Sequence, residues 1–387
     1  MTLSHVSGRD VVSGRSMQVT VDNGEIRSLT FASTEETTWL SPGLIDLQVN
    51  GYGGCDLNVD TVDADVVIAL TRKLLATGVT TYLPTIITGA EEQIEKSLRA
   101  VAAARKVDPL VARAVPFVSV EGPHISAEDG PRGAHPREYV RPPDLSEFER
   151  WQAASDNLVG MVTLSPHWEN APEYIAMLAA KGVLVAIGHT HATPAQIHLA
   201  ADAGAKLSTH LGNGVSGQLA RHPNLIWAQL ADDRLTATFI PDGHHLPADT
   251  LKVMLRAKGI ERSIFISDVV MLGGMEPGIY NVPIGGRVEL RPDGRLSMID
   301  AGFLAGAACP LKDGIAQATL SKTCTLGDAI RMSTENPGRF VGNRGILRPG
   351  AKADLVRFTL DAEARKMQIL SVLIEGVEFP IESASGI

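Results

Sequence analysis

The sequence has little cysteine and no long apolar run. Its three cysteines, Cys55, Cys309 and Cys324, lie far apart and form no Cys-x-x-Cys pair. This spacing excludes a disulfide-stapled scaffold and favours reduced thiols, as in cytoplasmic proteins. No stretch reaches about 18 uninterrupted apolar residues, and the N-terminus MTLSHVSGRDVVSG lacks a basic start followed by an apolar core. We therefore expect a soluble cytoplasmic protein with no membrane partner.

Basic charge is also scarce. Lys and Arg number 35 against 44 Asp and Glu, which leaves a formal net charge of −9, and the chain contains no basic run that would track a phosphate backbone. Nucleic acid is therefore not an expected partner. Apolar residues make up 44% of the chain and charged residues 20%, close to globular averages, so these 387 residues can bury a large core.

Both ends of the chain are rich in strand-forming patterns. MQVTVDNGEIRSLT alternates apolar and polar residues around the turn dipeptide Asn23-Gly24, which predicts a hairpin. From Gly345 onward, GILRPGAKADLVRFTLD and MQILSVLIEGVEF are further β-rich runs. We expect residues 1–41 and 343–387 to form one small β-sandwich domain.

The middle of the chain, residues 42–342, alternates short apolar runs with Ala- and Leu-rich segments typical of helices. Eight such runs predict parallel βα units, and therefore an α/β fold of the (β/α)8 TIM-barrel type. A doubly wound sheet would require a Gly-rich first turn that opens a helix, and Gly51 to Gly54 match that pattern only weakly. The runs are 43–50, 78–85, 114–121, 158–165, 182–189, 205–210, 235–242 and 263–268.

Polar residues suited to metal binding stand at the ends of four of these runs. Glu121 ends the third, His189 the fifth, His210 the sixth and Asp268 the eighth. Barrel enzymes place their active sites at this end of the strands. Imidazole and carboxylate groups are ligands for a divalent ion such as Zn²⁺, so we assign Glu121, His189 and His210 to one metal ion. Asp268 would accept a proton from the attacking water and deliver it to a leaving amine.

The first run ends in Gln48-Val49-Asn50, which places two amides on the same side of a strand. Neutral amides are poor ligands for transition metals, so we expect Gln48 and Asn50 to support a single-metal site, or only to bond water and neighbouring loops. His191 follows His189 at a spacing that also allows metal binding. His167 and His198 are expected at the surface or on helices.

An ordered set of motifs carries a resemblance that spans nearly the whole chain. It comprises PGLIDLQVNGYGG, VSVEGPHIS with a following RGAH, AIGHTHA, STHLGNG, PDGHHL, ISD, LAGA and a terminal GxLxPGxxADLV pattern. The chain resembles the N-acetylglucosamine-6-phosphate deacetylase family of the amidohydrolase superfamily. This resemblance implies a distorted barrel with a small β-sandwich, usually in a homodimer. It also implies a metal held by Glu121, His189 and His210, with Asp268 as the catalytic residue.

The resemblance further assigns the substrate contacts. Asn213, Gly214 and Arg221 follow the sixth-strand histidine, and His245 is the histidine of the DGxH motif. His135, in the GAH motif, would touch the sugar hydroxyls. Two alternatives stay open. Arg221 could be only a solvated charge in a loop, and His244 rather than its neighbour His245 could be the histidine that contacts the substrate. In this family an arginine or histidine of the partner subunit can also reach the phosphate.

The predicted function is metal-dependent deacetylation of an amino sugar phosphate, with N-acetylglucosamine 6-phosphate as the favoured substrate. The ion is expected to be Zn²⁺, although Fe²⁺, Co²⁺ and Mn²⁺ accept the same ligands. The chain departs from the family pattern at Gly212 to Val215, where many members have an aromatic residue followed by Asn-Ala-Met. This departure favours an alternative substrate, another N-acyl or cyclic amide. A non-catalytic barrel scaffold is a further alternative, which would need none of the four polar residues.

Overall fold

The computed structural model describes residues 3–31, 33, 35–282, 286–299 and 303–381. Its largest sheet has eight parallel strands in the order β14-β13-β12-β11-β10-β9-β8-β5. The strands are β5 (Leu44–Val49), β8 (Val79–Ile87), β9 (Val118–Glu121), β10 (Val159–Leu164), β11 (Leu184–Ile187), β12 (Leu207–Ser208), β13 (Thr236–Phe239) and β14 (Ser263–Phe265). Each corresponds to one of the eight predicted runs, and only β8 extends past the end of its run, to Ile87, so the barrel prediction is confirmed.

The barrel closes between its first strand and the segment after its last strand. Val49 forms a parallel bridge with Val269, and the main-chain N–H of Asp268 donates to the carbonyl of Gln48 at 3.1 Å. The ends of β5 and β14 are thereby brought side by side. Two residues that stand more than two hundred positions apart in the sequence, Asn50 and Asp268, meet at this closure.

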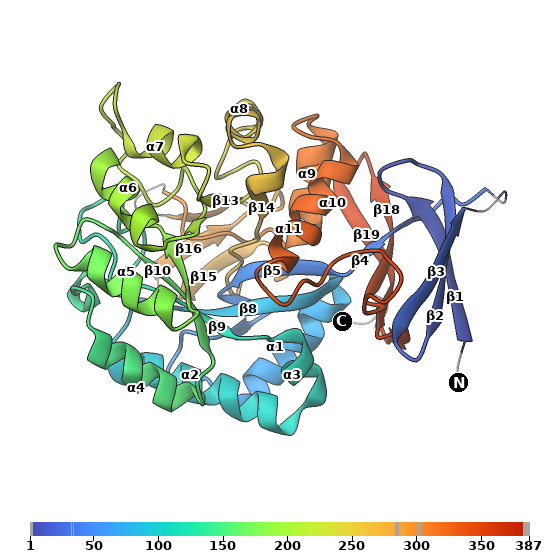
Figure 1. The fold of residues 1–387 in the computed structure, drawn as a ribbon, viewed down its shortest axis with the longest axis horizontal. Helices are drawn as coiled ribbons and strands as arrows, with labels where there is room; N and C mark the ends of the chain where they lie inside the picture. Colours follow the sequence, from blue (N-terminus) through green and yellow to red (C-terminus); the bar gives the residue numbers. More distant parts are fainter. Residues whose placement is uncertain (1–2, 32, 34, 283–285, 300–302, 382–387) are drawn as a thin grey trace.

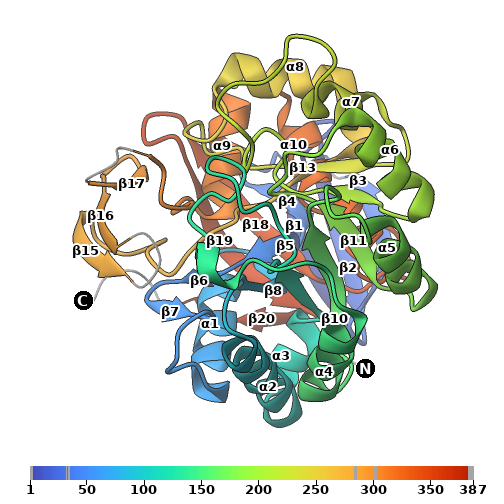
Figure 2. The same ribbon diagram turned by 90° about the vertical axis from the view of Figure 1, so that its left-hand side faces the viewer.

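Helices surround the barrel strands (Figure 2). They are α1 (Ala64–Ala76), α2 (Glu91–Val107), α3 (Pro109–Ala114), α4 (Leu145–Ser155), α5 (Ala171–Ala180), α6 (Pro194–Ala203), α7 (Leu225–Ala231), α8 (Ala248–Lys258), α9 (Leu311–Leu320), α10 (Leu326–Met332) and α11 (Glu335–Gly338), with 3-10 turns at Arg137–Tyr139 and Ile260–Arg262. None of the helices in the described ranges combines the length and apolar character needed to cross a bilayer.

Alternation along the strands separates two apolar layers. In β11, Val185 and Ile187 belong to the large cluster that packs against the helices, whereas Ala186 belongs to a smaller cluster inside the barrel. In β9, Val118 and Val120 face the helices, so Ser119 and Glu121 point to the interior. Apolar side chains therefore fill most of the barrel interior, and polar side chains stand at the carboxyl ends of its strands.

Both ends of the chain combine in a seven-stranded sheet of order β20-β19-β18-β4-β1-β2-β3, beside the barrel (Figure 1). The strands are β1 (Leu3–Asp10), β2 (Ser16–Asp22), β3 (Glu25–Phe31), β4 (Trp39–Pro42), β18 (Leu355–Asp361), β19 (Lys366–Ile374) and β20 (Val377–Phe379). Val19 and Ile26 from the first part share one apolar core with Leu355 and Leu373 from the last. This agrees with the predicted terminal sandwich, while the boundaries 1–41 plus 343–387 and 42–342 stay a prediction.

The segment after the eighth strand has a fold that no sequence pattern predicted. It forms a three-stranded antiparallel sheet of β15 (Gly278–Val282), β16 (Gly286–Leu290) and β17 (Leu296–Met298), which projects from the side of the barrel (Figure 2). A second small addition follows the first strand, where β6 (Gly51–Tyr52) pairs with β7 (Cys55–Asp56). Both additions contribute residues to the cavity at the barrel mouth.

Candidate active site

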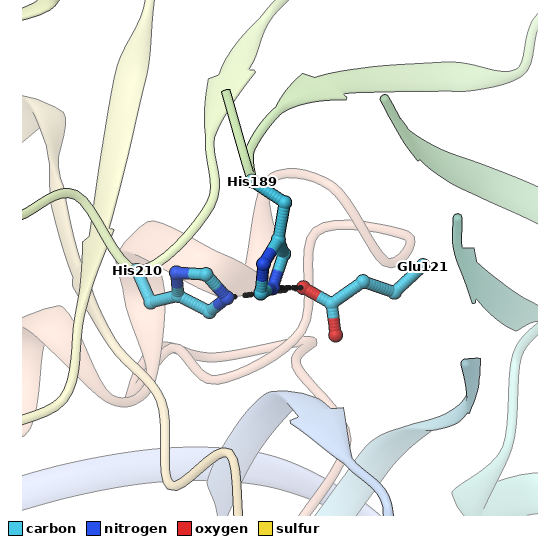
Figure 3. A group of neighbouring side chains, drawn as sticks. All are labelled: Glu121, His189 and His210. Atoms are coloured by element: carbon cyan, nitrogen blue, oxygen red, sulfur yellow. Dashed lines mark hydrogen bonds and ion pairs between the residues drawn. The ribbon is translucent and has the colours of Figure 1, made fainter. Parts of the chain in front are cut away.

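Glu121, His189 and His210 come together at the mouth of the barrel (Figure 3). Glu121 ends β9, His189 follows β11 and His210 follows β12. Oε1 of Glu121 lies 3.3 Å from Nε2 of His189 and 3.0 Å from Nε2 of His210. All three side chains are buried, and their ligand atoms lie within 4.8 Å of one another. The structure therefore brings together the three residues predicted to bind metal.

The backbone at the site adopts conformations that side chains usually avoid. His189, His210 and Asp268 have φ values of +47°, +30° and +53°, in the left-handed region. Such residues cost on the order of 1–3 kcal/mol each and gather at functional sites. Here each one stands two or three residues after the end of a barrel strand and lines the cavity at the barrel mouth, so the local strain serves the placement of the polar groups.

The hydrogen bonds of His189 show that this cluster suits a cation. Its Nδ1 lies 2.8 Å from the main-chain oxygen of Pro131, which can only accept, so Nδ1 carries the proton. In the neutral imidazole, Nε2 then presents a lone pair to Oε1 of Glu121 at 3.3 Å. Two such acceptors repel each other at this distance unless a proton or a metal cation lies between them. Two imidazoles and one carboxylate are a donor set for a borderline divalent ion.

The charges of the cluster depend on each other. Burial by itself would raise the pKa of Glu121, but hydrogen bonds and charge from His189 and His210 hold that pKa well below its usual range. Burial would conversely lower the pKa of His210, yet the hydrogen bond and charge of Glu121 raise it. Glu121 is thus an anion at neutral pH, as a metal ligand must be.

Gln48 and Asn50 each bind a carboxylate of the site. Gln48 Nε2 donates to Oε2 of Glu121 at 2.9 Å, which orients that carboxylate so that Oε1 faces the two histidines. Asn50 Nδ2 donates to Oδ1 of Asp268 at 2.8 Å and to its main-chain oxygen at 3.3 Å. Both amides are thus engaged with the two carboxylates of the site. That the site holds one metal ion rather than two stays a prediction.

Asp268 lines the same cavity as the Glu-His-His cluster. Burial raises the pKa of Asp268 to about 6; the charge of Glu121 adds to this rise, while His210, His245 and the bond from Asn50 oppose it. A divalent cation held by the cluster would lower this value through its positive charge. In the absence of that cation the carboxyl exchanges a proton near pH 6, within the range that an acid–base residue needs.

Four of the five predicted substrate residues also line this cavity: His135, Asn213, Gly214 and His245. The ring of His245 is held by Asp242, whose Oδ2 lies 2.7 Å from Nδ1. Of the two adjacent histidines, His244 turns away and places Nε2 3.0 Å from the main-chain oxygen of Asp293. Of the two, His245 lines the cavity and His244 does not, and the contact of His245 with a substrate stays a prediction.

His135 and Gly214 both pack against His189, one of the three predicted metal ligands. The rings of His135 and His189 have centroids 4.3 Å apart. Burial, followed by the charge of His189, lowers the pKa of His135 to about 3, so its imidazole is neutral. At Gly214, an added Cβ would lie 2.9 Å from Nδ1 of His189. This position excludes a side chain, which explains glycine there.

Arg221 is the predicted residue that the structure does not bring to the site. It is exposed in the loop between His210 and α7 and is not among the described residues that line the cavity. This placement fits the alternative in which Arg221 is a solvated charge in a loop, because its long cationic side chain is exposed. Its contact with a phosphate stays a prediction.

The structure adds lining residues that sequence reasoning missed. Asp56 and Asn58 come from the segment after β5, and Asn58 is fixed by bonds to the main chain of Thr85 and Ile87 at 3.1 and 2.9 Å. Among the described residues that line the cavity there is no lysine or arginine. An apolar wall comes from the chain after Asp268 and from the three-stranded sheet, comprising Val270, Met271, Leu272, Val282, Leu296 and Leu304. The apolar run at 269–272 was the only sequence signal for this wall.

A (β/α)8 barrel with a buried Glu-His-His cluster and an aspartate after its eighth strand defines the class of metal-dependent barrel hydrolases. The chain belongs to the amidohydrolase family, which residues 39–378 match.

Relatives of the chain are named for the removal of an acetyl group from an amino sugar phosphate. The chain is 32% identical to N-acetylglucosamine-6-phosphate deacetylase of Bacillus subtilis (strain 168), over 84% of this chain and 81% of the relative. It is 31% identical to N-acetylgalactosamine-6-phosphate deacetylase of Escherichia coli O157:H7, over 85% of each. The crystal structure of the N-acetyl-D-glucosamine-6-phosphate deacetylase from Mycobacterium smegmatis superposes with a TM-score of 0.84 at 25% identity, covering 97% of this chain and 99% of that one.

Proposed function

We propose that this protein hydrolyses the amide of an N-acetylated amino sugar 6-phosphate, with N-acetylglucosamine 6-phosphate as the favoured substrate, to the free amine and acetate. The observation that carries the proposal is that Glu121, His189, His210 and Asp268 line one cavity. The names of relatives at about 30% identity supply the substrate class. One Zn²⁺ per subunit, a homodimer and a cytoplasmic location belong to the same proposal.

Glu121, His189 and His210 would hold the metal ion. When bound, a divalent ion there supplies a Lewis acid that polarises an amide carbonyl and lowers the pKa of water. The carboxylate of Asp268 accepts one proton as the water oxygen bonds to the carbonyl carbon. When the C–N bond breaks, the same proton passes from Asp268 to the nitrogen, which leaves as an amine. Asn50 holds Asp268 in place for both transfers.

The remaining residues would position the sugar. His245 is anchored by Asp242 and His135 by Thr88, whose Oγ1 lies 2.9 Å from Nδ1 of His135. Fixed side chains of this kind hold the amide at attack distance, an entropic contribution that the ion alone does not make. Arg221 is proposed to bind the phosphate. Because Arg221 lies in an exposed loop, this contact requires either that the loop moves or that Arg221 binds the substrate of the neighbouring subunit in the homodimer.

The lining of the cavity favours a second candidate. Within the described part of the lining no lysine or arginine is present to neutralise a phosphate, and one wall is apolar. This combination suits an N-acylated amine without a phosphate. The two candidates share the same hydrolytic groups and differ only in the end of the substrate that lies away from the amide.

The deciding experiment measures acetate release from N-acetylglucosamine 6-phosphate, N-acetylgalactosamine 6-phosphate and unphosphorylated N-acetylglucosamine, with metal counted in the same preparation. Fast release that requires the phosphate supports the proposal, and the ratio between the two phosphorylated sugars assigns the epimer. Equal rates with and without phosphate favour the second candidate. One bound metal without acetate from any of the three sugars would overturn the substrate assignment and leave the hydrolytic site.

A further inference from the structure

Two histidines that the proposed reaction does not use lie in contact on the rim of the barrel. His167 follows β10 and His191 follows β11, and these two strands are neighbours in the sheet. Their ring centroids are 4.3 Å apart, with an angle of 44° between the planes. Both side chains are partly exposed. The loop after the adjoining strand β9 carries Glu128, whose Oε1 lies 3.7 Å from Nε2 of His191.

Each of these imidazoles is anchored through the same ring nitrogen to a buried serine. Nδ1 of His167 lies 2.6 Å from Oγ of Ser165, and Nδ1 of His191 lies 2.6 Å from Oγ of Ser126. Both serines are fully buried. The anchoring leaves the Nε2 atoms as the free ends of both rings, with no hydrogen-bond partner closer than Glu128 among the described residues.

The hydrogen bonds of Ser165 determine the tautomer of His167. Its hydroxyl donates to Oγ1 of Thr190 at 2.7 Å, so its oxygen must accept from Nδ1–H of the histidine. Nε2 of His167 therefore carries a lone pair. Burial, followed by the charge of His191, lowers the pKa of His167 to about 4, which keeps this lone pair free of a proton at neutral pH. Metal-binding histidines likewise have their tautomer fixed by a hydrogen bond from the other ring nitrogen.

Packing limits the rotation of the pair. The ring of Trp168 lies 4.3 Å from that of His167, and its Nε1 is fixed by the main-chain oxygen of His124 at 3.1 Å. Two oriented imidazoles with a carboxylate beside them form a nitrogen-rich donor set for borderline ions such as Zn²⁺, Ni²⁺ and Cu²⁺. A hard ion such as Mg²⁺ would prefer oxygen ligands.

We propose that the paired imidazoles of His167 and His191 form a second binding site for a transition-metal ion, on the rim of the barrel and separate from the Glu121-His189-His210 cluster, with Glu128 adding negative charge beside His191. Water completes the coordination, because the site is open to solvent. The proposal does not depend on which amide the enzyme hydrolyses.

The test is a Zn²⁺ titration of the full-length metal-stripped protein, followed by calorimetry. We expect two equivalents in the wild-type protein, one tight and one weaker. His167→Ala and His191→Ala should each lose the weaker equivalent, and His210→Ala should weaken the tight one and retain the rim equivalent. Ser165→Ala should weaken rim binding by about 10–100-fold, since it removes the tautomer-fixing partner.

His198→Ala is the matched control, because His198 also pairs with a carboxylate, Asp232 at 3.2 Å, but has no second imidazole beside it. It should keep both equivalents. A wild-type protein that binds only one Zn²⁺ would overturn the proposal, as would two equivalents retained in a His167→Ala/His191→Ala double variant. If the alanine variants fail to fold, His167→Gln and His191→Gln, which preserve side-chain volume, should show the same loss.

Discussion

Asn50 Nδ2 lies 2.8 Å from Oδ1 of Asp268, and this bond joins the end of the first barrel strand to the segment after the last. The closure of the barrel thus also positions the acid–base carboxylate. Because Asn50 donates to the ionised form of Asp268, it favours that form and lowers the pKa of the aspartate.

Asn50→Ala should therefore raise the pKa of Asp268. Proton acceptance requires the ionised carboxylate, so the acid limb of the kcat/KM profile should move to higher pH, while the metal content stays near wild type. A pH–rate profile between pH 4.5 and 9 on about half-unit steps checks this. A profile that only falls in height, with its acid limb unmoved, would contradict the positioning of Asp268 by Asn50.

Asp268→Asn and His210→Ala should separate proton transfer from metal binding. The first removes the proton acceptor and should lower kcat by about 10²–10⁴-fold with its metal retained. The second removes a ligand and should lose both metal affinity and turnover. Metal analysis alongside kcat measures both effects. Turnover near the wild-type rate in Asp268→Asn would show that another group moves the proton.

Gly214→Ala should damage the site through sterics alone. Its φ is +59°, and the new methyl group would lie 2.9 Å from Nδ1 of His189 and displace that ligand. We expect weaker metal binding and lower kcat. Gly182→Ala is the control, since its φ is +78° but nothing lies within 4 Å of an added Cβ. The control should lose only about 1–2 kcal/mol of stability from backbone strain. Equal metal affinity in the two variants would contradict this packing argument.

Asp46 should make the protein less stable as the pH rises through neutrality. Burial raises the pKa of Asp46 from 3.8 to about 7, so between these values the folded state binds a proton that the unfolded state has released. The free energy of unfolding then falls with increasing pH across this window. Asp46→Asn should flatten this slope, as measured by urea unfolding of the metal-free protein at pH 5 and 7.5. An unchanged slope would show that Asp46 does not cause it.

The sequence by itself determined the barrel and the meeting of the three predicted metal ligands. Apolar runs of strand length alternate with helical segments, and this local pattern predicts parallel βα units wherever it occurs. Because parallel strands of a barrel end on one face, residues such as Glu121, His189 and His210 that terminate strands had to meet there. The terminal hairpin around Asn23-Gly24 could also be predicted from the sequence, because the preference of these two residues for a tight turn is local.

Only the tertiary structure decided which loop residues reach the cavity. Arg221 and His245 both lie in polar loops after strands, yet one is exposed and the other is anchored inside by Asp242. Loop paths depend on contacts between distant segments, which no short pattern encodes. The same holds for the apolar wall from the three-stranded sheet and for the contact between His167 and His191. In both cases the fold brings together residues from separate segments, and the sequence around each segment does not predict the contact.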